Sequence, residues 1–237
     1  MKKLRKEKRE EHEKMLIGYY SKSVFITYLG VVSGTIGMYF AFNHKITFAL
    51  ICLIISGICD AFDGKVARKC KRTSNEKYFG IQIDSLADMV SFIFLPIMIF
   101  YGLGYTNWYN IIIFAVFTLG GVIRLGYFNV IAEEKATNNP VKYYSGLPVT
   151  SSAIIFPIVY IFSSFLTGVE FKMIYSLTMA FIAILYVLNF KVRKPDAKII
   201  YLFVVGGAAL IAALYLLKWF ITIQKIRNLK MKKYQKV

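Results

Sequence analysis

The chain has 237 residues, 57% of them hydrophobic and 16% aromatic, and its mean hydropathy is +0.53. This composition excludes an ordinary soluble domain, because several apolar runs approach the roughly 20 residues that a helix needs to cross a bilayer. The formal net charge of +17 does not indicate a nucleic-acid partner, because the Lys and Arg residues gather at the ends of the apolar runs, as cytoplasmic anchors do in membrane proteins.

Seven apolar runs predict the elements of the chain, all of them helices. In chain order they cover residues 24–42, 46–68, 80–102, 111–131, 146–166, 171–190 and 199–223. We expect a basic cytoplasmic N-terminal segment (1–23), a single membrane-embedded domain (24–224) and a basic tail (225–237). The predicted fold is an all-α, polytopic membrane helix bundle, with six core helices and one or two C-terminal helices.

Small residues and proline predict local details of these helices. One face of the first span suits close helix packing and carries Gly30, Ser33, Gly34, Thr35 and Gly37. Pro96 predicts a kink in the third span. In the last run, Gly206 and Gly207 allow either one helix or a short hairpin, so the total is seven or eight helices and the side of the basic tail stays open.

Four aspartates stand where the second and third runs meet the polar link between them. Ionisable groups in membrane segments cost about 2.5–3.5 kcal/mol each, so they are functional candidates by default. At about 100° per residue, one face of the second helix carries Asp60, Asp63, Gly64, Ala67 and Arg68. One stripe of the next helix carries Gly80, Asp84 and Asp88. Two antiparallel neighbours would aim the four carboxylates at one point.

Carboxylates gathered in this way cannot all stay ionised unless cations neutralise them. Oxygen ligands without His or Cys favour hard cations such as Mg²⁺, Mn²⁺ or Ca²⁺, and two such ions can hold a pyrophosphate. Arg68 suits phosphate binding through its planar donor fork, and Gly64 and Gly80 leave room for a nucleotide. The simpler interpretation, solvated acids at helix ends, does not explain why these residues stand in register.

These residues resemble the signature of the CDP-alcohol phosphotransferase family, D-x2-D-G-x2-A-R followed by G-x3-D-x3-D. Every fixed position is matched, by Asp60, Asp63, Gly64, Ala67, Arg68, Gly80, Asp84 and Asp88. The link from Lys69 to Phe79 is longer than is common in the family. We therefore expect the contacts of this link to differ from the family pattern, and the metal site to follow it.

The resemblance implies a bundle of about six core helices, usually a homodimer, that is open to the bilayer and the cytoplasm. Two divalent cations, Mg²⁺ or Mn²⁺, would be held by Asp60, Asp63 and Asp84, with Asp88 contributing to the second. Asp88 would also be the general base. The CDP group of a CDP-diacylglycerol donor would lie against Asp60, Gly64, Ala67, Arg68 and Gly80. The alcohol oxygen would attack the lipid-linked β-phosphorus, and CMP would leave.

A second segment bears on the alcohol. Residues 124–130, R-L-G-Y-F-N-V, and residues 144–148, Y-S-G-L-P, resemble the phosphatidylserine synthase branch, which typically reads R-L-A-R-F-N and then F-x-G-L-P-x-P. Tyr127 and Thr150 depart from that pattern. L-serine would then be the acceptor, and the residues implied in binding it are Arg124, Asn129, Gly146 and Pro148. Arg124 could pair with a serine carboxylate or a lipid phosphate, or snorkel to the headgroups.

Two other functions stay open. The same chemistry could use glycerol 3-phosphate, inositol phosphate or an amino alcohol as acceptor. A membrane transporter could use the acids as cation ligands, but that function leaves Gly64, Ala67 and Arg68 unexplained. For the enzyme we expect a multi-pass protein of the plasma membrane with its active site facing the cytoplasm.

Overall fold

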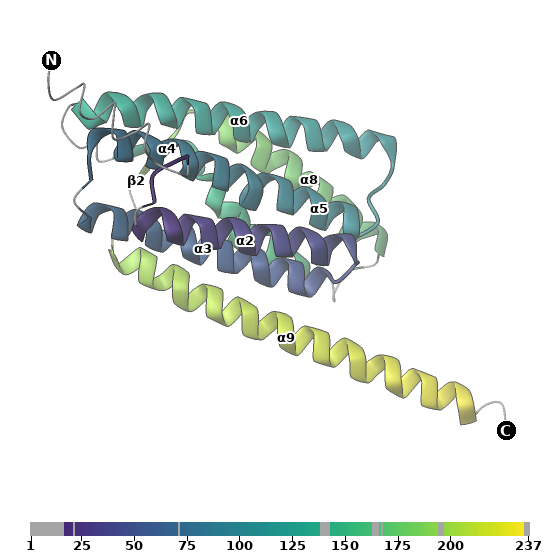
Figure 1. The fold of residues 1–237 in the computed structure, drawn as a ribbon. Coiled ribbons are helices and arrows are strands. Elements are labelled where there is room, and N and C mark those ends of the chain that lie inside the picture. The colour runs from purple at the N-terminus through teal and green to yellow at the C-terminus, as the bar shows by residue number, and fades with distance from the viewer. Residues whose placement is uncertain are drawn as a thin grey trace, which may run out of the picture.

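The structure is a computed structural model that describes residues 17–20, 22–70, 72–137, 143–162, 166, 168–193 and 197–234. Its helices run side by side in one bundle (Figure 1). In chain order the elements are α2 (Lys22–Phe42), α3 (Ile46–Lys69), α4 (Ser74–Asp88), the π-helix η1 (Met89–Phe94), α5 (Leu95–Gly102), α6 (Trp108–Thr137), β1 (Tyr143–Ser145), the 3₁₀-helix η2 (Val149–Ser151), α7 (Ser152–Phe162), α8 (Gly168–Val187), β2 (Lys191–Arg193) and α9 (Ala197–Tyr234). The predicted all-α membrane bundle is confirmed.

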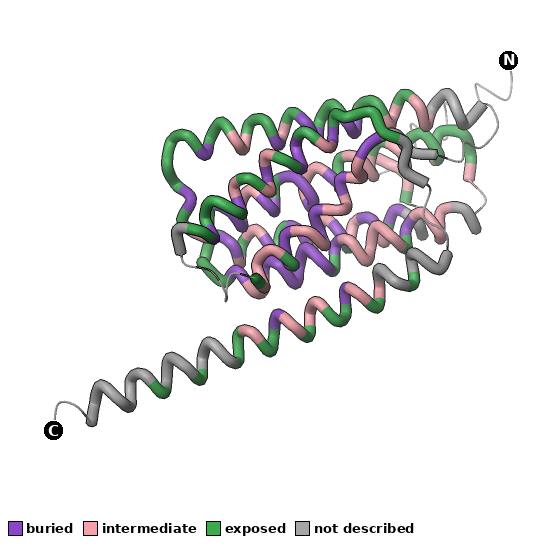
Figure 2. The backbone as a smooth tube through the Cα atoms, turned by 180° about the vertical axis from the view of Figure 1, so that it is seen from behind, coloured by how far each residue is buried: buried purple, intermediate pink, exposed green. Residues whose placement is uncertain are grey.

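Five helical segments of the described residues are long and apolar enough to cross a membrane. They are Val24–Phe42, Ile46–Ala67, Ser74–Gly102, Trp108–Ala132 and Glu170–Val187. Large apolar side chains stand exposed on the outside of the bundle, as Ile112 and Leu119 do on α6. Buried positions gather between the helices, while exposed ones follow the outer side of α6 (Figure 2). An apolar exterior of this kind suits contact with lipid.

Gly30, Ser33, Gly34 and Gly37 form the packing face of α2, whereas the predicted Thr35 is not part of it. A Cβ at Gly34 would lie only 2.9 Å from the hydroxyl oxygen of Ser91. The carbonyl of Gly30 accepts hydrogen bonds from the Ser56 hydroxyl at 2.9 Å and from the Ser91 hydroxyl at 3.3 Å. Thr35 is exposed and donates only to the carbonyl of Val31, one turn earlier in its own helix. Close approach of α2 to α3 and η1 therefore depends on the glycines.

The irregularity predicted at Pro96 is a π-helical turn. Pro96 has no N–H, so the carbonyl of Phe92 lacks its usual α-helical donor. The π turn η1 directly precedes α5, in which Pro96 is the second residue. The Ser152 hydroxyl donates to the Phe92 carbonyl at 3.1 Å. A residue at the start of α7 thus satisfies a backbone acceptor that the proline leaves open.

Two helix starts differ most from the predictions, each by six residues. α4 begins at Ser74 and not at Gly80, because Thr73 and Glu76 form a capping box that starts the helix earlier. The fifth predicted span, 146–166, is too long: Gly146 has φ +71° and Pro148 is extended, so regular α-helix begins only at Ser152. The apolar segment Val149–Phe162 is shorter than a bilayer-spanning helix.

The C-terminal run is one continuous helix, α9. Gly206 and Gly207 lie inside it without a break, so the alternative of a hairpin and eight helices is wrong. Glycine interrupts a helix less in lipid, where no water competes for its backbone groups. α9 packs along α3, where the Lys218 amine lies 3.8 Å from the ring centroid of Phe48. It continues past the end of the bundle that carries the α5–α6 turn (Figure 1).

Candidate active site

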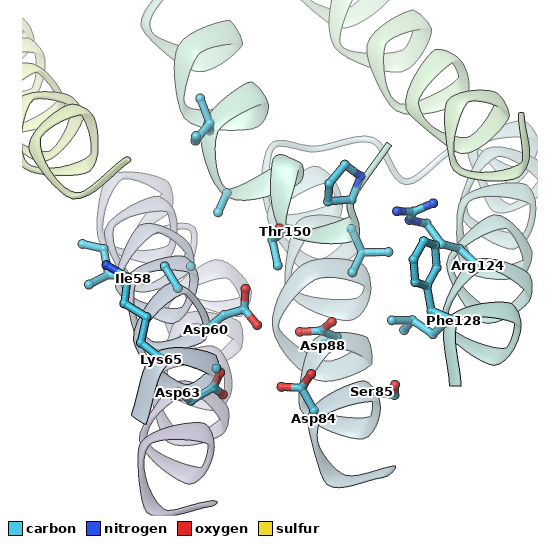
Figure 3. Close-up of a pocket in the computed structure, with 18 of the residues that line it drawn as sticks. Ile58, Asp60, Asp63, Lys65, Asp84, Ser85, Asp88, Arg124, Phe128 and Thr150 are labelled. Carbon is cyan, nitrogen blue, oxygen red and sulfur yellow. The ribbon is translucent and has the colours of Figure 1, made fainter. Parts of the chain in front are cut away.

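A cavity of about 460 Å³ lies among α3, α4, α6, η2–α7 and α9. Its polar lining includes Asp60, Asp63, Asp84, Asp88, Arg124 and Asn129. Asp60 and Asp63 project from α3 toward Asp84 and Asp88 on α4, while Arg124 and Phe128 of α6 lie beyond α4 (Figure 3). The structure therefore brings both predicted groups of residues, the acids and the Arg124 segment, to one cavity.

The acid cluster (Asp60, Asp63, Asp84 and Asp88) is compact. Carboxylate oxygens of Asp60, Asp84 and Asp88 all lie within 4.8 Å of one another. Asp63 stands beside them and accepts a hydrogen bond of 2.7 Å from the hydroxyl of Thr27 on α2. Asp63 and Asp88 are only 7% and 9% exposed, so water can do little to offset their mutual repulsion.

The donor set of the acid cluster fits a hard divalent cation. Its donors are carboxylate oxygens only, which is the chemistry that Mg²⁺, Mn²⁺ and Ca²⁺ prefer. Buried acids at this separation need positive charge between them. Lys65 and Arg124 are the basic side chains among the described residues that line the cavity. The Lys65 amine lies 5.5 Å from the ring centroid of Phe62.

The residues predicted to contact CDP are placed in different ways. A Cβ at Gly64 would meet nothing within 4 Å, and Gly64 lines the cavity, so the backbone of α3 is open to a ligand there. Ala67 and Gly80 are not among the cavity-lining residues. The space beside Gly80 holds a guanidinium nitrogen of Arg72, 3.2 Å from where a Cβ would be. The side chain of Arg68 lies outside what the structure describes.

Arg124 is held by the chain around it. It is 6% exposed, and its guanidinium lies 4.3 Å from the ring centroid of Phe128, one turn later in α6. A Cβ at Gly146 would lie 2.9 Å from a guanidinium nitrogen of Arg124 and 2.8 Å from the Leu188 carbonyl oxygen. The Gly146 N–H donates to the Phe190 carbonyl at 2.7 Å. Only a glycine lets this loop close over Arg124.

The other residues of the predicted acceptor segment differ in their roles. The Asn129 side-chain oxygen accepts from the Ser85 hydroxyl at 2.6 Å, and its amide nitrogen donates to the Gln82 side chain at 3.1 Å. Asn129 thus fastens α6 to α4 at the edge of the cavity. Pro148 lines the cavity directly, whereas Gly146 does not and acts through Arg124.

Sequence reasoning missed several residues that the structure adds to the site. Thr27 precedes Asp63 by 36 residues and bonds to it. Ser85, Phe128 and Val204 line the cavity. The spacing of Ser85 between Asp84 and Asp88 was a usable signal, because it places Ser85 at the edge of the same helix face. Nothing in the local sequence points to Thr27 or Val204.

The fold and the site define a polytopic membrane protein with a carboxylate cluster beside an internal cavity. The chain matches the sequence model of the CDP-alcohol phosphatidyltransferase family over residues 23–225. It therefore belongs to this family, as the eight motif residues implied. The match extends into α9, as far as residue 225, which the resemblance in the motif region did not reach.

Curated relatives carry related names. A Saccharomyces cerevisiae protein called CDP-diacylglycerol–serine O-phosphatidyltransferase is 36% identical over 112 residues, which are 45% of this chain and 40% of the yeast protein. A Helicobacter pylori protein of the same name is 30% identical over 70% of this chain and 68% of its own length. An archaetidylserine synthase of Methanothermobacter thermautotrophicus is 25% identical over 78% of this chain and 75% of its own length. The chain thus spans less than half of the yeast relative.

Proposed function

We propose that this protein is a phosphatidylserine synthase, an enzyme that transfers a phosphatidyl group from CDP-diacylglycerol to L-serine and releases CMP. The observation that carries the proposal is the acid cluster, in which carboxylate oxygens of Asp60, Asp84 and Asp88 lie within 4.8 Å of one another, in a cavity whose other side presents Arg124. Family membership supports the phosphatidyl transfer. The names of the yeast and Helicobacter relatives support serine as the acceptor.

Two divalent cations, Mg²⁺ or Mn²⁺, would be held by Asp60, Asp63, Asp84 and Asp88. Bound there, they would neutralise the pyrophosphate and the charge that grows on the leaving phosphate. The buried hydrogen bond from Thr27 fixes the orientation of the Asp63 carboxylate. Second contacts of this kind hold metal ligands in place.

Asp88 is the general base of the proposed reaction. It lies at the C-terminal end of α4, on the side of the acid cluster that faces Arg124 (Figure 3). The Asp88 carboxylate accepts the proton of the serine hydroxyl while that oxygen forms a bond to the β-phosphorus. The bond from this phosphorus to the oxygen of CMP breaks, and CMP leaves with the negative charge. Positioned proton transfer of this kind contributes about 10²–10⁴-fold to a rate.

Arg124 binds the serine carboxylate or the donor phosphate. Its planar guanidinium forms paired hydrogen bonds with such anions, and its burial strengthens them. Asn129 and Pro148 shape the same side of the cavity. Gly64 gives the CDP group access to the backbone of α3, and Ala67, Arg68 and Gly80 are proposed to complete that subsite.

The cellular setting belongs to the same proposal. Lys69, Lys71, Arg72 and Lys77 lie in the link between α3 and α4 and in the adjoining helix ends, and positive residues favour the cytoplasmic side. This distribution supports an acid cluster near the cytoplasmic face of the plasma membrane. We further propose a homodimer, with residues 24–224 as one catalytic domain between a basic N-terminal segment and a basic tail.

The test is CMP release by the purified protein from CDP-diacylglycerol. L-serine with Mg²⁺ or Mn²⁺ should give the fastest release, in a panel with glycerol 3-phosphate, inositol phosphate, ethanolamine and buffer alone. A chelator should stop it, and added metal should restore it. Release with another alcohol only would contradict serine as the acceptor. Metal-dependent transport of a solute across vesicles, without CMP release, would contradict the enzyme.

A further inference from the structure

Thr150 lines the cavity but has no part in the contacts described so far. It belongs to the short helix η2 and stands at the edge of the cavity that faces Asp60 and Asp88 (Figure 3). The pattern that this segment resembles ends in F-x-G-L-P-x-P, and Thr150 takes the place of the second proline. A proline has neither a hydroxyl nor an N–H. This chain therefore carries a hydrogen-bonding side chain at a point of the cavity where that pattern has none.

The Thr150 hydroxyl is free to bind a ligand. The structure shows no hydrogen bond from it to any described residue. Ser85 and Asn129, the other neutral polar side chains of the described cavity lining, are bonded to each other at 2.6 Å. Asn129 also donates to the side chain of Gln82 at 3.1 Å. Among the neutral polar side chains of this lining, Thr150 is therefore the one whose hydrogen-bonding capacity is unused within the described chain.

Two buried hydroxyl groups fix the backbone on both sides of Thr150. The Val149 carbonyl accepts a hydrogen bond from the Tyr186 hydroxyl of α8 at 3.2 Å, and the Ser152 hydroxyl lies 2.9 Å from the same oxygen. The Ser152 hydroxyl also bonds to the Phe92 carbonyl of η1. Both hydroxyl-bearing residues are buried, Tyr186 at 2% exposure and Ser152 at 0%. The helix η2 is thus fastened to α8 and to η1, so that Thr150 is held at the cavity.

L-serine carries three polar groups, and the proposed reaction accounts for two of them. Asp88 takes the proton of the hydroxyl, and Arg124 is available to the carboxylate. The ammonium group loses its water when serine is enclosed, so it needs a hydrogen-bond acceptor. The carboxylates of the acid cluster are occupied by the cations of that reaction. The Thr150 hydroxyl offers two acceptor lone pairs at the same cavity.

We propose that the Thr150 hydroxyl accepts a hydrogen bond from the ammonium group of the acceptor, and that Tyr186 is a positioning residue that holds η2 for this contact. The inference rests on the proposed function, because the acceptor is the alcohol that Asp88 deprotonates. Thr150 then makes the cavity selective for an alcohol that carries an ammonium group. Glycerol 3-phosphate has no such group and gains nothing from this contact.

The first experiment removes the hydroxyl and keeps the shape of the side chain. CMP release gives the KM for L-serine and the inhibition constant of 3-hydroxypropanoate, which is serine without its amino group. Thr150→Val should raise the KM for serine roughly tenfold, as when a hydrogen bond to a charged group is lost, and leave the inhibition constant unchanged. Thr150→Ser should restore the KM. Thr178→Val is the control, because the Thr178 hydroxyl bonds to the Ile174 carbonyl of its own helix and Thr178 is not among the cavity-lining residues.

The second experiment tests the positioning by Tyr186. Tyr186→Phe removes the donor to the Val149 carbonyl and keeps the ring, so the KM for serine should rise about two- to threefold while kcat stays unchanged. In a Thr150→Val background the same substitution should no longer change this KM, because no hydroxyl is left to position. Tyr105→Phe removes a buried 3.3 Å hydrogen bond to the Phe171 carbonyl and should leave the KM for serine unchanged. An equal effect of Tyr186→Phe in both backgrounds would contradict its role as a positioning residue.

The outcomes separate the two proposals. A wild-type protein that releases no CMP with L-serine contradicts the proposed function and this inference with it. A wild-type protein that uses serine, but whose KM for serine is the same in Thr150→Val, contradicts the inference alone. Equal weakening of serine and 3-hydroxypropanoate in Thr150→Val would mean a general change of the cavity and would also contradict a contact to the ammonium group.

Discussion

The acid cluster and the arginine wall (Arg124, Phe128 and Asn129) face the same cavity, but their charges are supported differently. Carboxylate oxygens of Asp60, Asp84 and Asp88 lie within 4.8 Å of one another, and these charges repel. Arg124 is stacked on Phe128 and enclosed at the Gly146 loop. Asn129 has hydrogen-bond partners at both ends of its amide. The acid cluster needs a bound cation to offset its repulsion, whereas the arginine wall is held in place by contacts within the chain.

This difference separates stability from activity. Removing a charge from the acid cluster relieves repulsion in the metal-free protein, as is common where function holds like charges together. Removing the guanidinium of Arg124 leaves the Phe128 ring and the Gly146 loop without the group on which they pack. The two sides should therefore respond to neutralisation with changes of opposite sign in the melting temperature, although both lose activity.

Asp88→Asn should have the largest effect. It keeps the shape of the side chain but cannot accept a proton, so CMP release should fall by about 10²–10⁴-fold. The melting temperature without metal should rise or stay equal. Glu170→Gln is the control, because Glu170 is exposed at the start of α8, far along the chain from the cluster. Wild-type turnover in the Asp88→Asn protein would show that Asp88 is not the general base.

Arg124→Gln should come next, with the opposite effect on stability. The melting temperature should fall, and the KM for serine should rise roughly 10–100-fold, as when a hydrogen bond to a charged group is lost. Arg227→Gln on the exposed surface of α9 serves as the control. If the loss appeared in the KM for CDP-diacylglycerol and not for serine, Arg124 would be assigned to the donor phosphate.

Thr27→Val tests whether the hydrogen bond from Thr27 helps to position the acid cluster for metal binding. The variant removes the 2.7 Å hydrogen bond to Asp63 and keeps the shape. The metal concentration that gives half-maximal activity should rise roughly tenfold, as for other second contacts of metal ligands. Thr27→Ser, which keeps the hydroxyl, should restore it. Thr35→Val removes an exposed hydroxyl of the same helix and should change nothing.

Gly146→Ala should give the smallest of these effects, measured as the free energy of unfolding. Positive φ costs an alanine about 1–2 kcal/mol. Gly104→Ala carries the same strain, at φ +91°, with nothing within 4 Å of the new methyl group. Gly146→Ala should be the more destabilising of the two, because its methyl group meets the Leu188 carbonyl and Arg124. Equal losses would mean that the loop yields without disturbing the arginine wall.

The acid cluster was predictable because its geometry is local. Two helices joined by a short link must lie near one another, and the spacing within each helix aims its carboxylates. The same locality explains the prediction of the apolar spans. The start of α4 was misplaced because the capping box of Thr73 and Glu76 stands inside a stretch whose lysines suggested a loop.

The rest depends on contacts between distant parts of the chain. Thr27 reaches Asp63 only because the glycines of α2 allow that helix to approach α3. Val204 and Gly207 reach the cavity because α9 lies along α3, and no spacing in the sequence specifies this neighbour. The glycine pair at 206–207 suggested a break, but one glycine is a contact point and the helix continues through both.

The π turn η1 changes the direction in which side chains point along the continuous helical span formed by α4, η1 and α5. A turn with an extra residue shifts everything after it by about one residue of rotation, roughly 100°. Asp88 is the last residue before this shift, and the fully buried Leu95 and Ile99 come after it. The π turn thus sets the rotation between the helix face that carries the carboxylates and the face that carries the core residues. Deleting a single residue from Met89–Phe94 would rotate the acids away from α3, although no residue of the acid cluster or of the core would be substituted.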